Sequence, residues 1–308
     1  MADSTPPPSP SGGSPRALDR AAVDAALRRL ARQAEPPWLH GEVARRMGER
    51  LAVIRLQPAT LVDWWGHTGA SREVLAAAYP GARRVVVEPV AALAERSRAS
   101  LKAPWWSPQR WRDLAEVRLD DPPPASAQLL WSNMMLHAVV DPPALLARWQ
   151  RALAVGGFAM FSCLGPGTLA ELRTLYREHG WPTPAPDFVD MHDLGDMLVA
   201  AGFADPVMDQ ETLVLTWATP QDLLAELRSM GGNASPSRAA GLRTPGWHGQ
   251  LLDALGSLAG PDGRLRLSFE VVYGHAFRAA PRAAVGSQTF VSVDDLRAMT
   301  RARRGGMS

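Results

Sequence analysis

The feature that most constrains the fold of this chain is a regular alternation of apolar runs and helical segments between residues 57 and 163. Four short apolar runs are predicted to be buried strands: "TLVDWW", "ARRVVVEP", "AQLLWSN" and "FAMFSCL". Helical segments lie between them: "REVLAAAY", "VAALAERSRASL" and "PPALLARWQRAL". Strands that alternate with helices at this spacing predict a parallel sheet with covering helices. The expected fold class is therefore α/β.

The segments on either side of this region have different patterns. Residues 18–56 contain two predicted amphipathic helices, whose apolar residues recur at helical spacing: Val23, Leu27 and Leu30, then Val43, Met47 and Leu51. Residues 164–282 contain predicted helices at 168–179, 193–201 and 221–230, and the predicted strands "ETLVLTWA" and "RLRLSFEVVYGHAFRA". About fifty residues separate these two strands. This spacing predicts an antiparallel edge pair with a helical insertion that serves as a lid.

Composition narrows the class of protein further. Residues 1–17 are expected to be a disordered Pro/Ser/Gly tail, and residues 283–308 a basic flexible tail, on either side of one domain at 18–282. The net charge is only +2 with both signs mixed, so no nucleic-acid-binding surface is expected. No apolar run reaches the roughly 18–20 residues of a membrane helix, and Cys163 is the single cysteine. We expect a cytoplasmic protein with neither disulfide nor metal site, of undetermined oligomeric state.

Polar residues at the carboxyl ends of the predicted strands form the candidate binding site, because ligands of open α/β sheets bind there. Asp63, Glu88 and Asn133 follow three successive strands, and a turn with Gly66 and Gly69 follows Asp63 in "LVDWWGHTGAS". Glu88 lies 19 positions beyond Gly69, close to the roughly 20-residue spacing at which an acid binds a ribose. Its carboxylate can accept hydrogen bonds from both ribose hydroxyls. A strand-end acid is also often a helix cap, so the pattern alone leaves both roles open.

Several segments resemble a known family: "WSNMMLH", "GGFAMFSCLGPGTLAELR", "DMHDLGDMLVAAGFADPVMD" and "EVVYGHAFRAAP". They are similar to class I S-adenosylmethionine-dependent methyltransferases and, more narrowly, to the malonyl-acyl-carrier-protein O-methyltransferases of biotin synthesis. The resemblance runs from about Leu18 to Pro281. It implies a Rossmann-like fold with a mostly parallel seven-stranded sheet, an antiparallel edge and a helical lid insertion. It also implies methyl transfer from S-adenosylmethionine to the free carboxylate of a malonyl thioester on acyl carrier protein.

In that family the first strand ends in an acidic residue and a G-x-G-x-G turn. Asp63 matches the acid and Gly69 the last glycine, whereas the first two glycine positions fall on Trp65 and His67. Glycine is used there because it adopts positive φ and lets a ligand approach the backbone. A shift of one residue would instead use Gly66 as the turn glycine. The altered turn leaves an alternative open, that of a non-catalytic descendant that keeps the fold.

Other positions also differ from the family. Gln128 takes the place of an acid before the third strand, and Asp120 or Asp121 is the candidate acid near the adenine. Trp38 is the candidate counterpart of a tyrosine in the family's N-terminal helical segment. Three more tryptophans are expected to fill core space beside the altered turn: Trp105, Trp106 and Trp111.

The implied transfer needs no general base, because a carboxylate is already ionised at neutral pH. Holding that carboxylate calls for an arginine, and Arg173 in the predicted lid is the candidate, with a solvated helix charge as the alternative. His137, after the third strand, is expected to shape the acceptor pocket. An acidic carrier protein is expected to dock on lid arginines: Arg228, Arg238 and Arg243. A nicotinamide-dependent dehydrogenase, the remaining alternative, fits the alternating strands but neither the "GPGT" segment nor the antiparallel end.

Overall fold

The computed structural model describes residues 18–101, 115–241 and 243–280. The predicted tails at 1–17 and 283–308 lie outside the described residues, as do the three tryptophans between positions 105 and 111. Within the described chain, strands and helices alternate in the predicted order. No helix of this part of the chain is long and apolar enough to cross a membrane.

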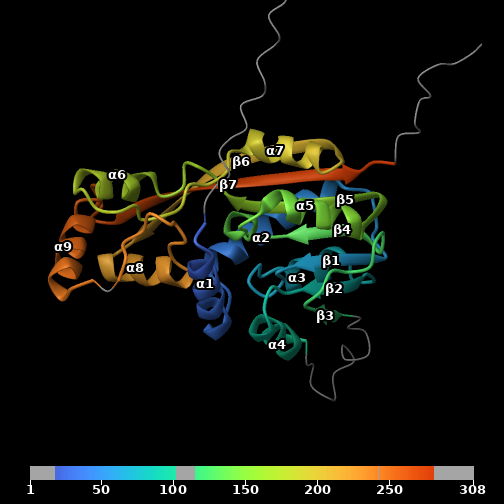
Figure 1. Ribbon diagram of the computed structural model, residues 1–308, viewed down its shortest axis with the longest axis horizontal. Coiled ribbons are helices and arrows are strands. Elements are labelled where there is room, and N and C mark those ends of the chain that lie inside the picture. Colours follow the sequence, from blue (N-terminus) through green and yellow to red (C-terminus); the bar gives the residue numbers. More distant parts are fainter. Residues whose placement is uncertain (1–17, 102–114, 242, 281–308) are drawn as a thin grey trace, which may run out of the picture.

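Seven strands of the described chain form a single sheet in the order β3-β2-β1-β4-β5-β7-β6 (Figure 1). Their bounds are Thr60–Trp64 for β1, Arg83–Val87 for β2, Glu116–Arg118 for β3, Ala127–Ser132 for β4, Leu153–Leu164 for β5, Phe203–Trp217 for β6 and Leu265–Arg278 for β7. Strands β1 to β5 are parallel, whereas β7 runs antiparallel to both β5 and β6. This topology confirms the predicted mostly parallel sheet with an antiparallel edge.

Helices cover both faces of the sheet, and each face has its own apolar core. The helices outside the lid are α1 (Arg20–Arg32), α2 (Trp38–Arg50), α3 (Arg72–Ala78), α4 (Ala91–Ser100), α5 (Pro142–Ala152) and α7 (Met191–Ala200). Successive residues of a strand point to opposite faces. Leu61 of β1 therefore joins the core formed with α2 and α3, and Val62 joins the core formed with α5 and α7.

The lid consists of α6 (Ala170–Glu178), α8 (Pro220–Ser229) and α9 (Pro245–Gly256). Figure 1 shows these helices grouped around one end of the long strands β6 and β7, beyond the parallel strands. The sequence predicts no helix at α9, yet its start carries two ordinary signals. Thr244 accepts a hydrogen bond from the backbone of Trp247, and Pro245 occupies the first turn.

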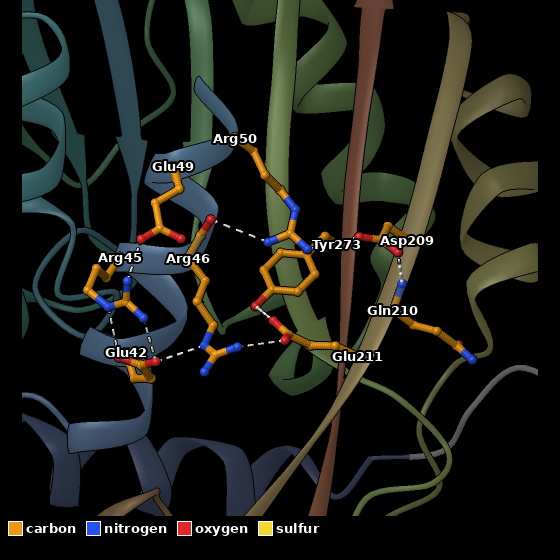
Figure 2. A network of polar contacts seen from close by, with 9 residues as sticks. All are labelled: Glu42, Arg45, Arg46, Glu49, Arg50, Asp209, Gln210, Glu211 and Tyr273. Carbon is orange, nitrogen blue, oxygen red and sulfur yellow. Dashed lines mark hydrogen bonds and ion pairs between the residues drawn. The ribbon is translucent and has the colours of Figure 1, made fainter. Parts of the chain in front are cut away.

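A network of charged side chains joins α2 to the antiparallel edge (Figure 2). Glu211 of β6 accepts a hydrogen bond from the Tyr273 hydroxyl at 2.6 Å and forms an ion pair with Arg46 at 2.8 Å. Arg50 binds Asp209 at 2.8 Å and stacks over the Tyr273 ring, 3.8 Å from its centroid. These contacts fix α2 against the two strands that lead to the lid.

Candidate active site

The turn after β1 keeps the backbone of a glycine loop despite its bulky side chains. Trp65 donates its backbone N–H to the Val87 carbonyl at 2.7 Å, and Gly69 donates to the Trp65 carbonyl at 2.9 Å. Trp65 has a φ of 58°, in the left-handed region that glycine favours. For an L-residue this conformation costs about 1–2 kcal/mol. The residue at the first expected glycine position therefore adopts the glycine conformation while carrying an indole.

Position 66 needs a glycine because a side chain would not fit there, and not because its φ is positive. A Cβ on Gly66 would lie 2.5 Å from Asp63 Oδ2 and 2.9 Å from Val86 Cγ1. In the described turn, the residues with positive φ are Trp65 and Ala70. The alternative in which Gly66 serves as the positive-φ turn glycine is therefore wrong.

Glu88, which follows β2, is fully buried beside this turn. Its Oε1 accepts hydrogen bonds from the backbone N–H of His67 at 2.8 Å and from the Ser97 hydroxyl at 2.6 Å. Its Oε2 is buried and has no partner among the described residues. Burial raises the pKa of Glu88 to about 7, because it disfavours the charged carboxylate, and the nearby Asp63 carboxylate adds to this rise. Glu88 thus has one buried acceptor oxygen that no described residue uses.

Asp63, near the end of β1, is also buried, and burial raises its pKa to about 6. Its Oδ1 has no hydrogen-bond partner in the described part of the chain. Asp63 lines a cavity of about 930 Å³ on the side of α3 and α4, together with Gly66 and His67. These residues do not line the cavity that contains Glu88. Direct contact of Asp63 and Gly66 with a cofactor stays a prediction.

Asn133, which follows β4, ties the turn to α2. Its side-chain nitrogen donates to the Gly69 carbonyl at 2.6 Å and to the His40 carbonyl at 2.7 Å. Its Oδ1 accepts a hydrogen bond from the Ser162 hydroxyl at 2.6 Å. Both amide hydrogens are therefore used by backbone carbonyls. Asn133 and Gly69 position the turn, and their direct contact with a cofactor stays a prediction.

His40 of α2 reaches the turn, whereas Trp38, the predicted residue of this segment, is 62% exposed. The Nδ1 of the buried His40 donates to the Thr68 carbonyl at 2.6 Å. Burial lowers the pKa of His40 to about 4, so its ring is neutral at pH 7 with the proton on Nδ1. The helical spacing of His40, Val43 and Met47 on the buried face was the signal that could have identified it.

Two adjoining cavities lie at the carboxyl edge of the sheet. The first has a volume of about 380 Å³ and contains Glu88. The second has a volume of about 220 Å³, is mostly apolar and lies between the turn after β1 and the lid. Four residues line both cavities: Val23, Leu27, Trp65 and Ala138. Trp65 therefore stands at the junction between them.

His137 lines the second cavity together with His40. It lies in a short 3-10 helix, Leu136–Ala138, after β4. Its Nδ1 accepts the backbone N–H of Leu164 at 3.3 Å, so the neutral ring carries its proton on Nε2. The ring meets Phe188 edge-on, with the two centroids 5.9 Å apart. Phe188 lies in the segment 179–190 between α6 and α7, called the lid connection below. His137 thus connects the end of the parallel sheet to the lid side of the cavity.

Arg173 of α6 is not among the described residues that line this cavity. Its guanidinium donates to the carbonyl of Thr168 at 3.2 Å and to that of Pro186 at 2.5 Å. The guanidinium carbon also lies 5.5 Å from the centroid of the Phe188 ring. Arg173 therefore holds the lid connection that forms one cavity wall. Among the described lining residues, the arginine is Arg228, which is exposed near the end of α8.

The remaining predicted departures from the family lie elsewhere. Gln128 is at the start of β4, on the opposite edge of the sheet, where it accepts a backbone N–H of β1 at 2.9 Å. Gln128 therefore lies away from the carboxyl ends of the strands. Asp120 pairs with Arg118 at 2.6 Å, and Asp121 accepts from Arg148 at 2.9 Å. Both acids are bound to arginines, and neither lines the cavity that contains Glu88.

Helix α1 covers the same edge of the sheet and is bound to the loop after α8. Asp19, which caps α1, forms an ion pair with Arg238 at 2.5 Å. The side chain of Gln33 donates to the Ser229 carbonyl at 2.8 Å. These contacts join α1 to the lid. The same helix lines both cavities.

The sheet order, the turn after β1 and the buried acid after β2 define the Rossmann-like fold of class I methyltransferases. The YcgJ protein from Bacillus subtilis matches with a TM-score of 0.51 and 8% identity, covering 76% of this chain and 98% of that one. A protein from Bacillus halodurans described as a candidate methyltransferase matches with a TM-score of 0.52 and 12% identity, covering 78% and 100%. At these identities the likeness shows the fold alone.

No family model matches the chain, but curated relatives identify its family. The relative from Gallionella capsiferriformans is 37% identical over 250 residues, 79% of this chain and 85% of the relative. The relatives from Laribacter hongkongensis and Halorhodospira halophila are 38% and 36% identical, covering 79% and 86% of this chain and 84% and 90% of their own lengths. All three are named malonyl-acyl-carrier-protein O-methyltransferase, and the chain belongs to this family. This membership favours an enzyme over a non-catalytic descendant or a dehydrogenase.

Proposed function

We propose that this protein transfers a methyl group from S-adenosylmethionine to the free carboxylate of a malonyl group on acyl carrier protein, as a cytoplasmic step of biotin synthesis. Membership of the family supports the reaction class. The observation that carries the proposal is the position of Glu88 after β2: it lines a cavity that adjoins a second, apolar cavity beside the lid, and its buried Oε2 has no partner among the described residues.

The residues of the first cavity fit the nucleoside part of S-adenosylmethionine. Glu88 can accept a ribose hydroxyl on Oε2, because His67 and Ser97 already hold its Oε1. Such a donor favours the charged carboxylate and so lowers the pKa of Glu88 from its raised value. Leu119 and Met135 supply apolar walls of the same cavity, which suits an adenine ring. When bound, the cofactor supplies an electrophilic methyl group on a sulfonium.

The second cavity suits the transfer itself. A carboxylate oxygen forms the new bond to the methyl carbon as the carbon–sulfur bond breaks, and the bonding pair stays on sulfur. No proton moves, so neither His40 nor His137 has to act as a base. His137 lines this cavity and shapes it, while the apolar walls exclude water. The contribution of the protein is therefore alignment of the reacting groups in a dry site.

Two arginines are candidates for holding the acceptor carboxylate. Arg173, the predicted ligand, would have to exchange a backbone carbonyl partner for the carboxylate. Arg228 already lines the second cavity and is exposed at its edge. An arginine next to a carboxylate supplies parallel donors and charge together. We assign the binding of the acceptor carboxylate to one of these two residues. Substituting each arginine in turn distinguishes between them.

The docking surface for the acidic carrier protein is proposed on the lid. Of the three predicted arginines, Arg238 is bound to Asp19 of α1. Arg243 is exposed and stacks over Trp247, with its guanidinium carbon 4.1 Å from the ring centroid. Arg228 is exposed at the cavity. Arg228 and Arg243 are therefore the charges available to steer an acidic partner.

The reaction is tested by mass spectrometry of malonyl-acyl carrier protein incubated with the protein and S-adenosylmethionine. We expect the carrier to gain the mass of one methylene. Glu88→Ala should abolish both the gain and cofactor binding, whereas Glu95→Ala, an exposed glutamate on α4, should change neither. An unmodified carrier in the presence of bound cofactor would refute the proposed acceptor. Complementation of a biotin auxotroph then tests the physiological role.

A further inference from the structure

Trp65 occupies a position where a glycine would be less strained. Its φ of 58° costs an L-residue about 1–2 kcal/mol, and that cost disappears with glycine. The indole is only partly buried, and it packs against two apolar groups, one on the α5 side of the sheet and one formed with α1. Backbone strain at a binding site points to a role for the residue that bears it.

The position of Trp65 between the two cavities limits what its indole can contact. The first cavity contains Glu88, the proposed ribose ligand, and the second contains His137, on the acceptor side. In S-adenosylmethionine the sulfur is attached one carbon beyond the ribose ring and carries the methyl group to be transferred. The sulfur therefore belongs at the junction of the cavities, where Trp65 lines both.

We propose that the indole of Trp65 makes a cation–π contact with the sulfonium and thereby discriminates S-adenosylmethionine from its product, S-adenosylhomocysteine. This inference rests on the proposed function. The two ligands share their adenosine and amino-acid parts, but only the substrate carries a positive charge on sulfur. Tryptophan is the best aromatic partner for a cation. His40 in the same cavity is neutral, so it does not oppose the charge.

The contact has a functional consequence. Loss of the methyl group removes the charge, so the contact weakens in the same step that forms the product. The product then binds less tightly than the substrate, and the cofactor site empties more readily for the next turnover. A glycine in this position has no π face and supplies no such discrimination.

Titration calorimetry with each of the two ligands tests the proposal without any acceptor. We expect Trp65→Leu to weaken binding of S-adenosylmethionine by about 2- to 30-fold, the range for one cation–π contact. Binding of S-adenosylhomocysteine should stay within about twofold, which also shows that the variant is folded. Trp65→Phe should give an intermediate loss for the charged ligand. Val53→Ala, which changes an exposed apolar residue outside these cavities, is the control and should alter neither affinity.

The outcomes separate the inference from the function on which it rests. If the wild-type protein binds both ligands and Trp65→Leu changes both affinities by the same factor, the indole is a steric wall and the inference is wrong. A rise in both affinities in Trp65→Gly would show that the indole blocks the site, and would overturn it equally. If the wild-type protein binds neither ligand at millimolar concentration, the proposed function fails together with the inference.

Discussion

Replacing Glu88 with glutamine should make the ligand-free protein more stable at alkaline pH. Burial raises the pKa of Glu88 from 4.5 to about 7 in the folded state. The folded state therefore binds this proton more tightly than the unfolded state does. As a result, the free energy of unfolding falls as the pH rises from about 4.5 to about 7, and then stays level. One pKa unit corresponds to about 1.4 kcal/mol, so the full difference is about 3 kcal/mol.

Glutamine cannot ionise, yet its amide oxygen can still accept from His67 and Ser97. We expect Glu88→Gln to raise the free energy of unfolding by about 1–3 kcal/mol near pH 8, and by almost nothing near pH 5. Urea unfolding at several pH values without cofactor measures this difference. Asp63→Asn is the matched comparison, because burial raises the pKa of Asp63 from 3.8 to about 6. The gain in the free energy of unfolding should therefore reach its full size at a lower pH for Asp63→Asn than for Glu88→Gln.

Two results would contradict this reasoning. A gain that is the same at every pH would show that ionisation of Glu88 is not its cause. A Glu88→Gln variant no more stable than the wild type near pH 8 would show that burial does not raise the pKa. The same variant should bind S-adenosylmethionine more weakly, because its single carbonyl oxygen is already engaged. Unchanged affinity would remove Glu88 from the cofactor site.

Three further substitutions test the geometry of the site and its support. Gly66→Ala should lower the free energy of unfolding by about 1–3 kcal/mol, because its Cβ would lie 2.5 Å from Asp63 Oδ2. Thermal melting measures this loss. Adding Asp63→Ala to the same variant should recover part of it. Arg228→Ala should raise the KM for the malonyl carrier and leave the Tm unchanged, whereas Arg173→Ala should lower the Tm by freeing the lid connection; an unchanged KM in both variants excludes both as carboxylate ligands. Glu211→Gln should cost about 1 kcal/mol, less at high salt; a loss of the same size in dilute and concentrated salt would contradict the ion-pair assignment.

The parallel half of the sheet could be predicted because its signal is local. Each strand there is a short buried run that ends at a turn, and each helix carries an apolar stripe. The limits of the antiparallel strands were harder to predict. Strand β6 begins at Phe203, well before the expected start at Glu211. Within the sheet of the described residues, the early part of β6 is an exposed edge paired with β7, so it needs no continuous apolar run.

The site was predicted less completely, because its contacts join segments far apart in the chain. The hydrogen bond from Asn133 to the carbonyl of His40 spans 93 residues, and no local pattern predicts it. The sequence shows Trp65 at a position where the family has a glycine. Its positive φ and its place between two cavities depend on the packing of α1 and β2 around it. Strand periodicity alone does not supply that information.

The shared wall provided by α1 has a thermodynamic consequence. Val23 and Leu27 border the cavities of both proposed ligands, and the same helix is bound to the lid through Asp19. A ligand bound in either cavity would pack against this wall and stabilise α1 in the position that the other ligand contacts. Cofactor and acceptor should therefore bind with positive cooperativity, and linkage requires the enhancement to be the same in both directions.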